Sequence, residues 1–222
     1  GTTTGRMSSN NPNLQNIPAR GEHGVEIRQA FMAAKGFELL SFDYSQIEMR
    51  ILAQLAQDDE LIKIFKEQKD VHTSVAARVF KVPEQEVTKD MRRKAKVINF
   101  GIIYGMGVNA LKVNLGSTRD EAQEFYDNFF KTFPTIRQYF DCVISGAYKK
   151  GFTETLFGRR RYFPGLKSHL PYLRATAERM AMNAPLQGTA ADIVKLAMID
   201  TDKEIKKRKL DDKVFLSTHL MF

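Results

Sequence analysis

Two carboxylates, Asp43 and Glu48, stand five positions apart in SFDYSQIEMR, residues 41–50. Asp43 ends an apolar run, and Glu48 lies where a helical pattern begins. Carboxylate oxygens are hard donors that suit Mg²⁺, so the two side chains could share a metal ion. Each could also act separately, because Ser45 and Glu48 have the spacing of a helix capping box, which would fix the Glu48 carboxylate. The spacing alone leaves both possibilities open.

A second group of candidate residues recurs every four positions in RRKAKVINFGIIYG, residues 92–105. It comprises Arg92, Lys96, Phe100 and Tyr104. Each step turns a helix by about 400°, so the four form a stripe that drifts by about 40° per step. Cations match phosphate oxygens and rings offer faces for a base, so the stripe would suit a nucleotide. Alternatively, the cations form a solvated face and the rings belong to the core.

Composition narrows the class of protein. The 34 Lys and Arg against 26 Asp and Glu give a net charge of +8, which favours a polyanionic partner but is also common among soluble proteins. The runs FGRRRYF and KEIKKRK could contact phosphates or form solvated faces. The single cysteine, Cys142, excludes an internal disulfide or a Cys-based zinc cluster. No apolar run reaches the ~20 residues of a membrane span, so a soluble protein of a reducing compartment is expected.

The two ends of the chain carry the strand-like patterns. Residues 25–34 and 37–44 are predicted as two strands joined by a turn, the second delivering Asp43 at its C-terminal end. The apolar residues 213–222 are predicted as a further strand, at which the sequence stops as a piece of a longer protein would. These patterns predict a small sheet formed by the two ends, two lobes, and a cleft between them for a substrate.

The middle of the chain is predicted to be almost wholly helical. Thr118 and Glu121 have the capping-box pattern, and Gly151 is a C-terminal stop. Pro185 and Gly188 should separate two later helices, and Gly158 should lie in a small hairpin. The helical patterns cover residues 58–68, 71–81, 88–105, 117–133, 135–151, 171–184 and 188–209, with the hairpin at 152–166.

Four motifs together resemble the family A DNA polymerases of the bacterial DNA polymerase I type, in that family's order and spacing. They are GRMSSNNPNLQNIP, DYSQIEMR, RRKAKVINFGIIYG and RMAMNAPLQGTAADIVKLAM. The resemblance implies an α+β, mostly helical fold: a right-hand polymerase palm with a small antiparallel sheet and inserted helical fingers. The palm would comprise residues 1–57 and 173–222 and the fingers 58–172, with the thumb, proofreading and 5′-nuclease domains absent.

The resemblance separates the two opening carboxylates. Asp43 matches the aspartate that helps to hold two Mg²⁺ ions, with the Tyr44 backbone carbonyl as a further metal ligand. Paired cations suit phosphoryl transfer because charge develops on both the attacking and the leaving oxygens. Without the resemblance, a strand-end Asp would more often be a turn or cap residue. Glu48 matches the sugar gate that blocks a ribose 2′-hydroxyl.

The remaining site residues are also implied by the resemblance. Lys96 joins Asp43 and Glu48 as a catalytic residue, and His72, otherwise an ordinary helix-surface residue, matches a contact to the incoming phosphates. The deoxynucleotide contacts are Tyr44, Gln46, Glu48, His72, Arg92, Lys96, Phe100 and Tyr104. The primer-template contacts are Arg6, Asn13, Gln15, Asn16, Arg179, Asn183, Gln187 and His219.

The sequence departs from the family at its third palm motif. The spacing places His219 in register, but Leu220 and Met221 stand where the family has Asp and Glu. Aliphatic side chains cannot bind Mg²⁺, so this chain should be impaired in catalysis. A corrupted or truncated end is favoured over a polymerase relic that binds DNA without extending it.

The sequence therefore predicts part of a monomeric, magnesium-dependent DNA polymerase that adds deoxynucleotides to a primer 3′ end. Its partners would be primer-template DNA and deoxynucleoside triphosphates, with no membrane. It would work in the cytoplasm of a bacterium or a phage-infected cell, or in an organelle. The alternative is a non-catalytic nucleic-acid-binding module.

Overall fold

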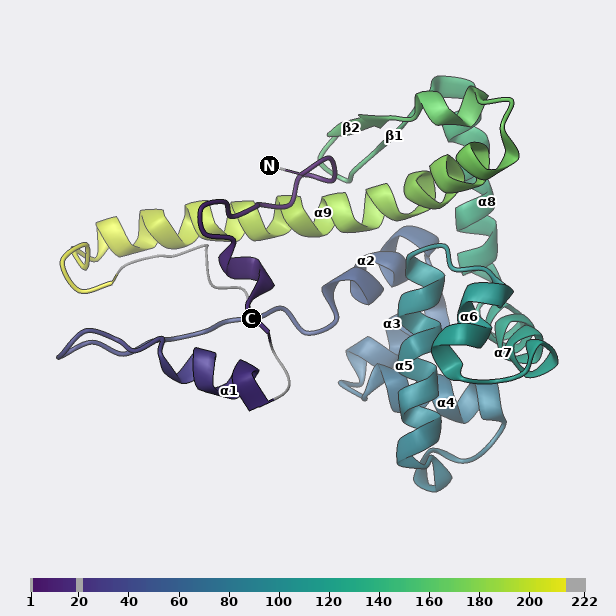
Figure 1. The fold of residues 1–222 in the computed structure, drawn as a ribbon, viewed down its shortest axis with the longest axis horizontal. Coiled ribbons are helices and arrows are strands. Elements are labelled where there is room, and N and C mark those ends of the chain that lie inside the picture. The colour runs from purple at the N-terminus through teal and green to yellow at the C-terminus, as the bar shows by residue number, and fades with distance from the viewer. Residues whose placement is uncertain (1, 19–21, 215–222) are drawn as a thin grey trace. The chain divides into compact units, whose positions relative to one another are not determined.

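The computed structural model describes residues 2–18 and 22–214 (Figure 1). The chain divides into two compact units. Unit 1 comprises residues 1–45 and 191–222, and unit 2 comprises residues 46–190. The predicted last strand, with His219, Leu220 and Met221, lies outside the described residues except for its first two positions, 213 and 214, which form no strand. The limits of palm and fingers stay predictions.

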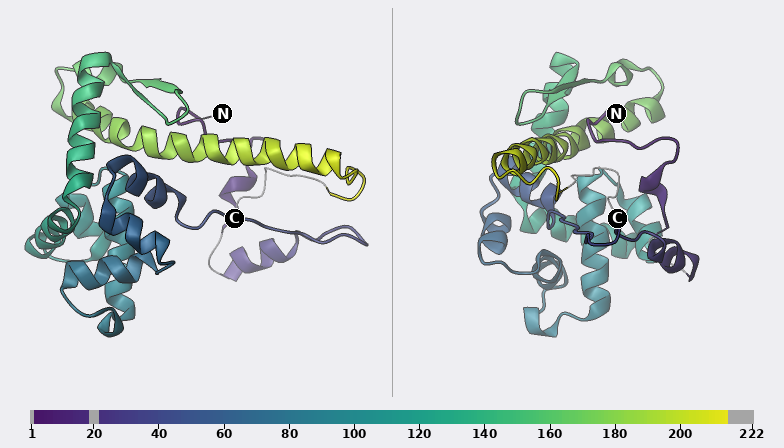
Figure 2. Two further views of the ribbon diagram at one scale, coloured as in Figure 1. Left: turned by 180° about the vertical axis from the view of Figure 1, so that it is seen from behind. Right: turned by 90° about the vertical axis from the view of Figure 1, so that its left-hand side faces the viewer.

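Unit 2 begins with helices that alternate with short loops. They are α2 (Ile47–Ala56), α3 (Asp59–Lys66), α4 (Val71–Phe80), the 3-10 turn η2 (Glu84–Glu86), α5 (Lys89–Ile103), α6 (Val108–Leu115), α7 (Arg119–Thr132) and α8 (Pro134–Lys150). Helices α3 to α7 gather into one block, and α8 leads from it to a hairpin, as two further views also show (Figure 2). None of the described helices has the length and apolar character that crossing a membrane requires.

Side-chain caps define where several of these helices begin. Asp58, Asp70, Thr88 and Thr118 each accept a hydrogen bond from a backbone N–H in the first turn of the helix that follows. The Thr118 hydroxyl and the Glu121 carboxylate bond each other's backbone N–H, so the predicted capping box is confirmed. The predicted stop of α8 is also confirmed, because Gly151 follows the helix with a φ of +79°.

The core of unit 2 lies between these helices. Leu61, Val75, Ile98 and Phe129 are buried there, and α4 packs against α5. Buried Asp58 caps α3 through a 2.9 Å bond from the Leu61 N–H and also accepts the Thr135 hydroxyl of α8. A buried carboxylate with both oxygens bonded fixes helix directions without leaving an orphaned charge.

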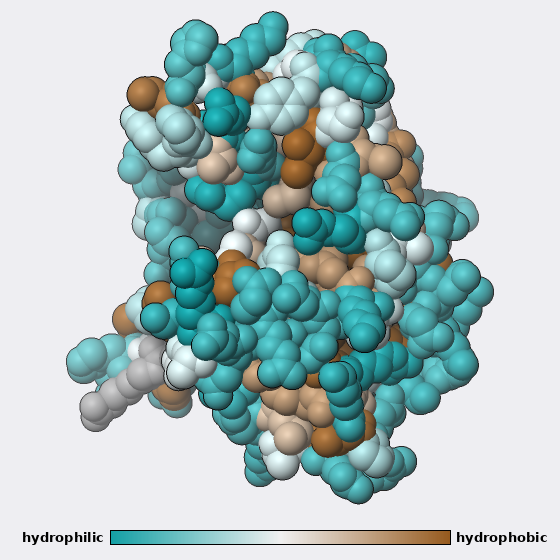
Figure 3. Space-filling model, turned by 90° about the vertical axis from the view of Figure 1, so that its right-hand side faces the viewer, coloured by the Kyte–Doolittle hydropathy of each residue, from teal (hydrophilic) through white to brown (hydrophobic). Residues whose placement is uncertain are grey.

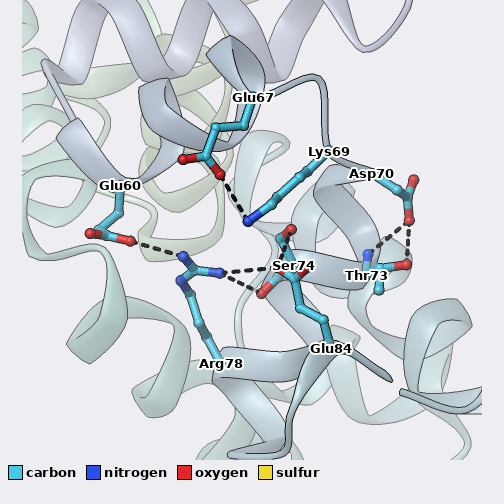
Figure 4. Close-up of polar contacts among 8 residues, drawn as sticks. All are labelled: Glu60, Glu67, Lys69, Asp70, Thr73, Ser74, Arg78 and Glu84. Atoms are coloured by element: carbon cyan, nitrogen blue, oxygen red, sulfur yellow. Dashed lines mark hydrogen bonds and ion pairs between the residues drawn. The ribbon is translucent and has the colours of Figure 1, made fainter. Parts of the chain in front are cut away.

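Polar contacts join α3, α4 and η2 at the surface of this block (Figure 4). Arg78 on α4 donates to the Glu60 carboxylate at 2.9 Å and to the Ser74 carbonyl at 3.0 Å. The Ser74 hydroxyl donates to Glu84 at 2.8 Å. Exposed ion pairs of this kind contribute little stability, so the apolar core holds the block together. On the face drawn in Figure 3, hydrophilic side chains cover most of the surface, with small apolar groups among them.

The hairpin packs on the last helix. Strands β1 (Phe152–Glu154) and β2 (Arg160–Tyr162) pair antiparallel, with Phe152 opposite Tyr162, which confirms the predicted hairpin. After the 3-10 turn η3 (Pro164–Lys167), α9 runs from Pro171 to Lys207. The Leu156 N–H donates to the Thr189 hydroxyl at 3.1 Å, and Arg159 donates to the Gly188 carbonyl at 2.9 Å. These bonds fix the hairpin to the middle of α9.

The prediction of two helices separated at Pro185 and Gly188 is wrong, because α9 continues through both. Proline removes one backbone hydrogen bond and usually kinks or ends a helix. Here Ala184 and Leu186 on either side are buried, at 5% and 0% exposure. Their packing on both sides of Pro185 offsets the lost bond.

The mostly helical fold with a small antiparallel sheet is confirmed, but the predicted sheet of the two chain ends is not found among the described residues. Within the described residues the only sheet is β1–β2, from the middle of the chain. Residues 25–29 belong to helix α1 (Glu22–Gln29), which follows the 3-10 turn η1 (Leu14–Asn16), and residues 37–44 form no strand. Leu40 and Phe42 are 75% and 91% exposed, so no packed face holds this segment as a strand.

Candidate functional site

The stripe of cations and rings runs along α5, and its members differ in exposure. Arg92 and Lys96 are exposed, Phe100 is half-buried, and Tyr104 at the C-cap is 41% exposed. The buried residues of the helix are Ala95, Ile98, Asn99, Gly101, Ile102 and Ile103. The interpretation that both rings are core residues is therefore wrong for Tyr104. The Lys96 Nζ lies 6.0 Å from the centroid of the Phe100 ring, so a cation and a ring face are adjacent.

Asp70 pairs with the first cation of the stripe. Its carboxylate accepts bonds from Arg92 Nε at 2.8 Å and Nη2 at 3.0 Å, the bidentate geometry that guanidinium and carboxylate favour. The same carboxylate caps α4 by accepting the Thr73 N–H at 2.9 Å (Figure 4). Burial raises the pKa of Asp70, but the bonds from Arg92 and Thr73 outweigh it and lower that pKa from 3.8 to about 2. The guanidinium is thus held in place while half-exposed.

His72 lies in the first turn of α4 and is buried, with 1% exposure, so the interpretation as an ordinary surface histidine is wrong. Its ring centroid is 5.9 Å from that of Phe100. The Nδ1 atom lies 3.0 Å from the Asn99 Nδ2, and Nε2 is buried with no hydrogen-bond partner among the described residues. Burial lowers the pKa of His72, Asp70 opposes this, and Arg92 and Lys96 lower it further. The ring is therefore neutral at pH 7.

The first turn of α2 holds Glu48. The helix begins at Ile47 with Gln46 in the left-handed region as its N-cap residue, so Ser45 is not the N-cap and that prediction is wrong. Gln46 has a φ of 54°, and it makes no side-chain cap bond. Glu48 is 9% exposed, and its Oε2 has no partner among the described residues. An unpaired carboxylate oxygen is thus held on a rigid helix.

The far end of α5 meets α9. The Asn183 Nδ2 donates to the Ile103 carbonyl at 3.3 Å, and Arg179, which is exposed, donates to the Thr176 hydroxyl at 2.9 Å. A Cβ placed on Gly105 would lie 3.2 Å from the Arg179 Cα. Gln187 continues this four-residue spacing along α9 and is half-buried. Tyr104 is thereby brought next to the segment that carries Arg179 and Asn183.

The candidates in unit 1 form a separate group. Asn13 caps η1 by accepting the Gln15 N–H at 3.1 Å, and the Gln15 Nε2 donates to the Met7 carbonyl at 3.3 Å. Arg6 and Asn16 are exposed. These side chains stabilise a compact turn, while His219, assigned to the same role, lies outside the described residues.

Asp43 and Tyr44 are exposed and lie in no helix or strand, so the predicted position of Asp43 at a strand end is wrong. No cluster of three or more His, Cys, Asp or Glu side chains that could hold a metal ion occurs within residues 2–18 and 22–214. Asp43 offers one hard carboxylate, whereas Leu220 and Met221 offer no oxygen donor. The donors of this chain therefore do not fit a complete two-metal site.

Sequence reasoning missed two residues of the site. Asp70 had a visible signal, because an acidic residue directly before a helical pattern and three before Thr73 is typical of an N-cap. Asn99 had none, because a polar residue inside a helical pattern does not reveal which buried side chain it meets.

Comparison with known proteins gives consistent matches. The DNA polymerase I of Pseudomonas aeruginosa is 50% identical over 216 residues, which are 97% of this chain and 24% of that protein. The DNA polymerase I of Bacillus caldotenax is 48% identical over 219 residues, 98% of this chain and 25% of that protein. The chain thus spans about a quarter of the length of these relatives.

A solved structure matches the fold. It is the POL domain of Pol1 from M. smegmatis in complex with DNA primer-template and dNTP, with a TM-score of 0.90 and 44% identity. The match covers 98% of this chain and 39% of that one. The sequence model described as DNA polymerase family A matches residues 1–220, and the chain belongs to that family.

Proposed function

We propose that this chain is part of a DNA-templated DNA polymerase that adds deoxynucleotides to a primer 3′ end. The observation that carries the proposal is the stripe of Arg92, Lys96, Phe100 and Tyr104 along one exposed side of α5, beside His72, in a chain of this family. DNA primer-template and a deoxynucleotide, the ligands of the similar M. smegmatis structure, are the proposed partners.

The stripe would bind a nucleotide triphosphate along the helix. Arg92 and Lys96 are both exposed. The ammonium group of Lys and the guanidinium group of Arg each carry several N–H donors, which suit phosphate oxygens. Phe100 and Tyr104 follow toward the C-terminal end of α5 and would contact the sugar and base through their faces. The direction of the helix would therefore align phosphates with its first half and the base with its second.

The second proposed group contacts primer-template DNA. Arg179, Asn183 and Gln187 lie at four-residue spacing on α9, next to Tyr104 at the end of α5. Asn, Gln and Arg can bond the minor-groove acceptors that all base pairs share, so they would test pair geometry without reading sequence. Arg6, Asn13, Gln15 and Asn16 would contact the same DNA, and His219 is proposed with them.

Two Mg²⁺ ions would supply activation of the primer 3′-hydroxyl and stabilisation of the leaving pyrophosphate. We propose that the Asp43 carboxylate and the Tyr44 backbone carbonyl would provide some of the ligands of these ions. The missing oxygen donors at positions 220 and 221 leave the set incomplete.

Glu48 is proposed as the sugar gate. The proposal is supported by its burial on α2 and its unpartnered Oε2. A carboxylate held in this way would meet a ribose 2′-hydroxyl in a fixed position. Glu48→Ala should raise the ratio of ribonucleotide to deoxynucleotide incorporation, and an unchanged ratio would refute the role.

Primer extension by the full-length protein with Mg²⁺ tests the proposed function. Protein carrying Leu220→Asp and Met221→Glu should extend a primer on a template, and adding Asp43→Ala should lower the rate by at least about a hundredfold, on the scale of losing a catalytic charge. Asp59→Ala in the same background, which removes an exposed carboxylate from α3, is the matched control. Extension at an equal, measurable rate with and without Asp43→Ala would refute the assignment of Asp43.

A non-catalytic DNA-binding protein is the second candidate, and Leu220 and Met221 favour it. Such a protein would bind primer-template without extending it. Leu220→Asp together with Met221→Glu separates the two candidates: gain of extension supports a polymerase impaired at these positions. Tight binding with no extension by either protein supports the non-catalytic module.

A further inference from the structure

Asn99 is the most deeply buried polar residue of α5, with 0% exposure, and no proposed nucleotide contact involves it. Its side-chain Nδ2 lies 3.0 Å from the Nδ1 of His72 on α4. An amide nitrogen carries hydrogens and no lone pair that can accept, so it acts only as a donor. With the amide in this orientation His72 Nδ1 accepts, and the Asn99 Oδ1 is buried with no hydrogen-bond partner among the described residues.

This bond determines where the ring carries its proton. A neutral imidazole has one N–H, and the nitrogen that accepts a hydrogen bond is the one without it. With Nδ1 accepting from Asn99, the proton of neutral His72 is on Nε2. Burial and the cations Arg92 and Lys96 lower the pKa of His72 against the opposing effect of Asp70, so the neutral form prevails at pH 7.

The Nε2 donor has no acceptor among the described residues, although it is buried. A buried donor without a partner is energetically unfavourable, so a structure that retains one indicates an acceptor that comes from elsewhere. The charged groups that act on the ring include two cations, Arg92 and Lys96, and Asp70 is already bonded to Arg92. An anion with oxygen acceptors is the ligand that this surrounding favours.

We propose that Asn99 is a positioning residue that fixes His72 as the Nε2–H tautomer, so that the ring donates to a phosphate oxygen of the incoming nucleotide. The proposal rests on the proposed function for the identity of the anion. The tautomer itself does not depend on it. Asn99 acts through His72 and does not touch the nucleotide.

The tautomer can be measured directly. The chain has four histidines, so ¹⁵N-histidine labelling with His72→Gln as the assignment variant identifies the ring signals of His72. Wild type should show a protonated Nε2 and an unprotonated Nδ1 at pH 7.5, in the absence of nucleotide. A protonated Nδ1 in wild type would overturn the proposal, whatever the enzyme does.

Two substitutions at position 99 test whether Asn99 fixes the tautomer of His72. Asn99→Leu removes the donor while keeping the number and branching of the side-chain heavy atoms, and the His72 signals should become a mixture of tautomers. Asn99→Asp replaces the donor by an acceptor, and Nδ1 should become protonated. Unchanged Nε2–H signals in both folded variants would overturn the role of Asn99, and the wild-type tautomer decides the question if either variant fails to fold.

A pair of substitutions at His72 tests the donor position. The amide nitrogen of Gln falls near the Nε2 position of histidine, whereas that of Asn falls near Nδ1. His72→Asn should raise the KM for a deoxynucleotide about tenfold more than His72→Gln does, as expected for a lost bond to a charged group. Equal KM values for the two variants would overturn the proposal. Failure to extend a primer even after Leu220→Asp with Met221→Glu would refute the proposed function and leave the tautomer result standing.

Discussion

Asp70 bonds two helices at once through a single carboxylate. It caps α4 through the Thr73 N–H and pairs with Arg92 on α5 in a bidentate arrangement. The charged form makes all of these bonds, which is why they lower its pKa to about 2 against the effect of burial. Asp70 thereby positions a cation that is proposed to bind phosphate.

Asp70→Asn should remove the negative charge that pairs with Arg92 and keep the cap of α4, because Asn is also a good N-cap residue. A carboxyl whose pKa is lowered on folding stabilises the folded state above its unfolded pKa, here 3.8, and this stabilisation is lost as pH falls toward about 2. Because the side chain is 41% exposed, screening reduces the contribution to about 1 kcal/mol. Urea denaturation should show this loss for Asp70→Asn at pH 7 and a shrinking difference from wild type below pH about 4.

Asp90→Asn is the control for this experiment. Asp90 also pairs with an arginine, Arg93 at 2.7 Å, but within one exposed turn of α5. Its removal should change the denaturation midpoint less than Asp70→Asn does. A pH-independent difference between wild type and Asp70→Asn would contradict the role of the charge.

Residue identities were easier to predict than residue environments. The stripe on α5 follows from the helical period, because four-residue spacing places side chains on one side whatever surrounds them. The burial of His72 could not be predicted, because it depends on the packing of α4 against α5, which are separate in sequence. The same holds for the Asn99 contact.

At the scale of elements, the junction of α5 with α9 depends on Gly105. Its φ is +65°, and a Cβ there would lie 2.6 Å from the Met182 Cε and 3.2 Å from the Arg179 Cα. Glycine adopts this conformation at the lowest steric cost, and the backbone of α9 cannot move aside as a side-chain end could. The close approach brings Tyr104 to the DNA-contact segment proposed on α9.

Gly105→Ala should destabilise the protein by about 2–3 kcal/mol, combining the cost of a left-handed alanine with the close contacts. Gly107→Ala is the matched control, because a Cβ there meets nothing within 4 Å and its backbone is extended. Thermal unfolding of the two variants measures the difference. Equal melting temperatures would contradict the close packing of this junction.

Helices were predicted better than strands for a physical reason. A helix bonds within itself, so capping residues such as Thr118 and the stop at Gly151 are visible in the local sequence. A strand needs a partner, and alternation in residues 37–44 does not show whether one is present. Pro185 led to the wrong prediction of a helix end, because tertiary packing kept α9 continuous through it.

For the whole molecule, the net charge of +8 is the property that bears on the proposed binding of DNA. Much of the local charge is already paired: Lys206 bonds Asp202 at 2.7 Å, and Arg208 bonds Glu204 at 2.8 Å, each within α9. Arg160 of the hairpin bonds Glu154 at 2.7 Å. The solvated-face interpretation of both basic runs is thereby favoured over phosphate contact.

Affinity for primer-template DNA should fall at least tenfold between about 50 and 200 mM salt, since each neutralised phosphate releases a counterion. Fluorescence anisotropy over a salt series gives the slope. Replacing Lys206 and Lys207 by Gln should leave that slope nearly unchanged, because both cations pair within their own helix. A clearly smaller slope in this variant would assign the run to DNA contact.

The most direct test of the central claim is template-directed addition of one nucleotide by the full-length protein. Primers placed before each of the four template bases are incubated with Mg²⁺ and single deoxynucleotides, and the products are resolved by length. The proposed polymerase should add only the nucleotide complementary to the template base. Addition that ignores the template, or no addition even after Leu220→Asp with Met221→Glu, would contradict it.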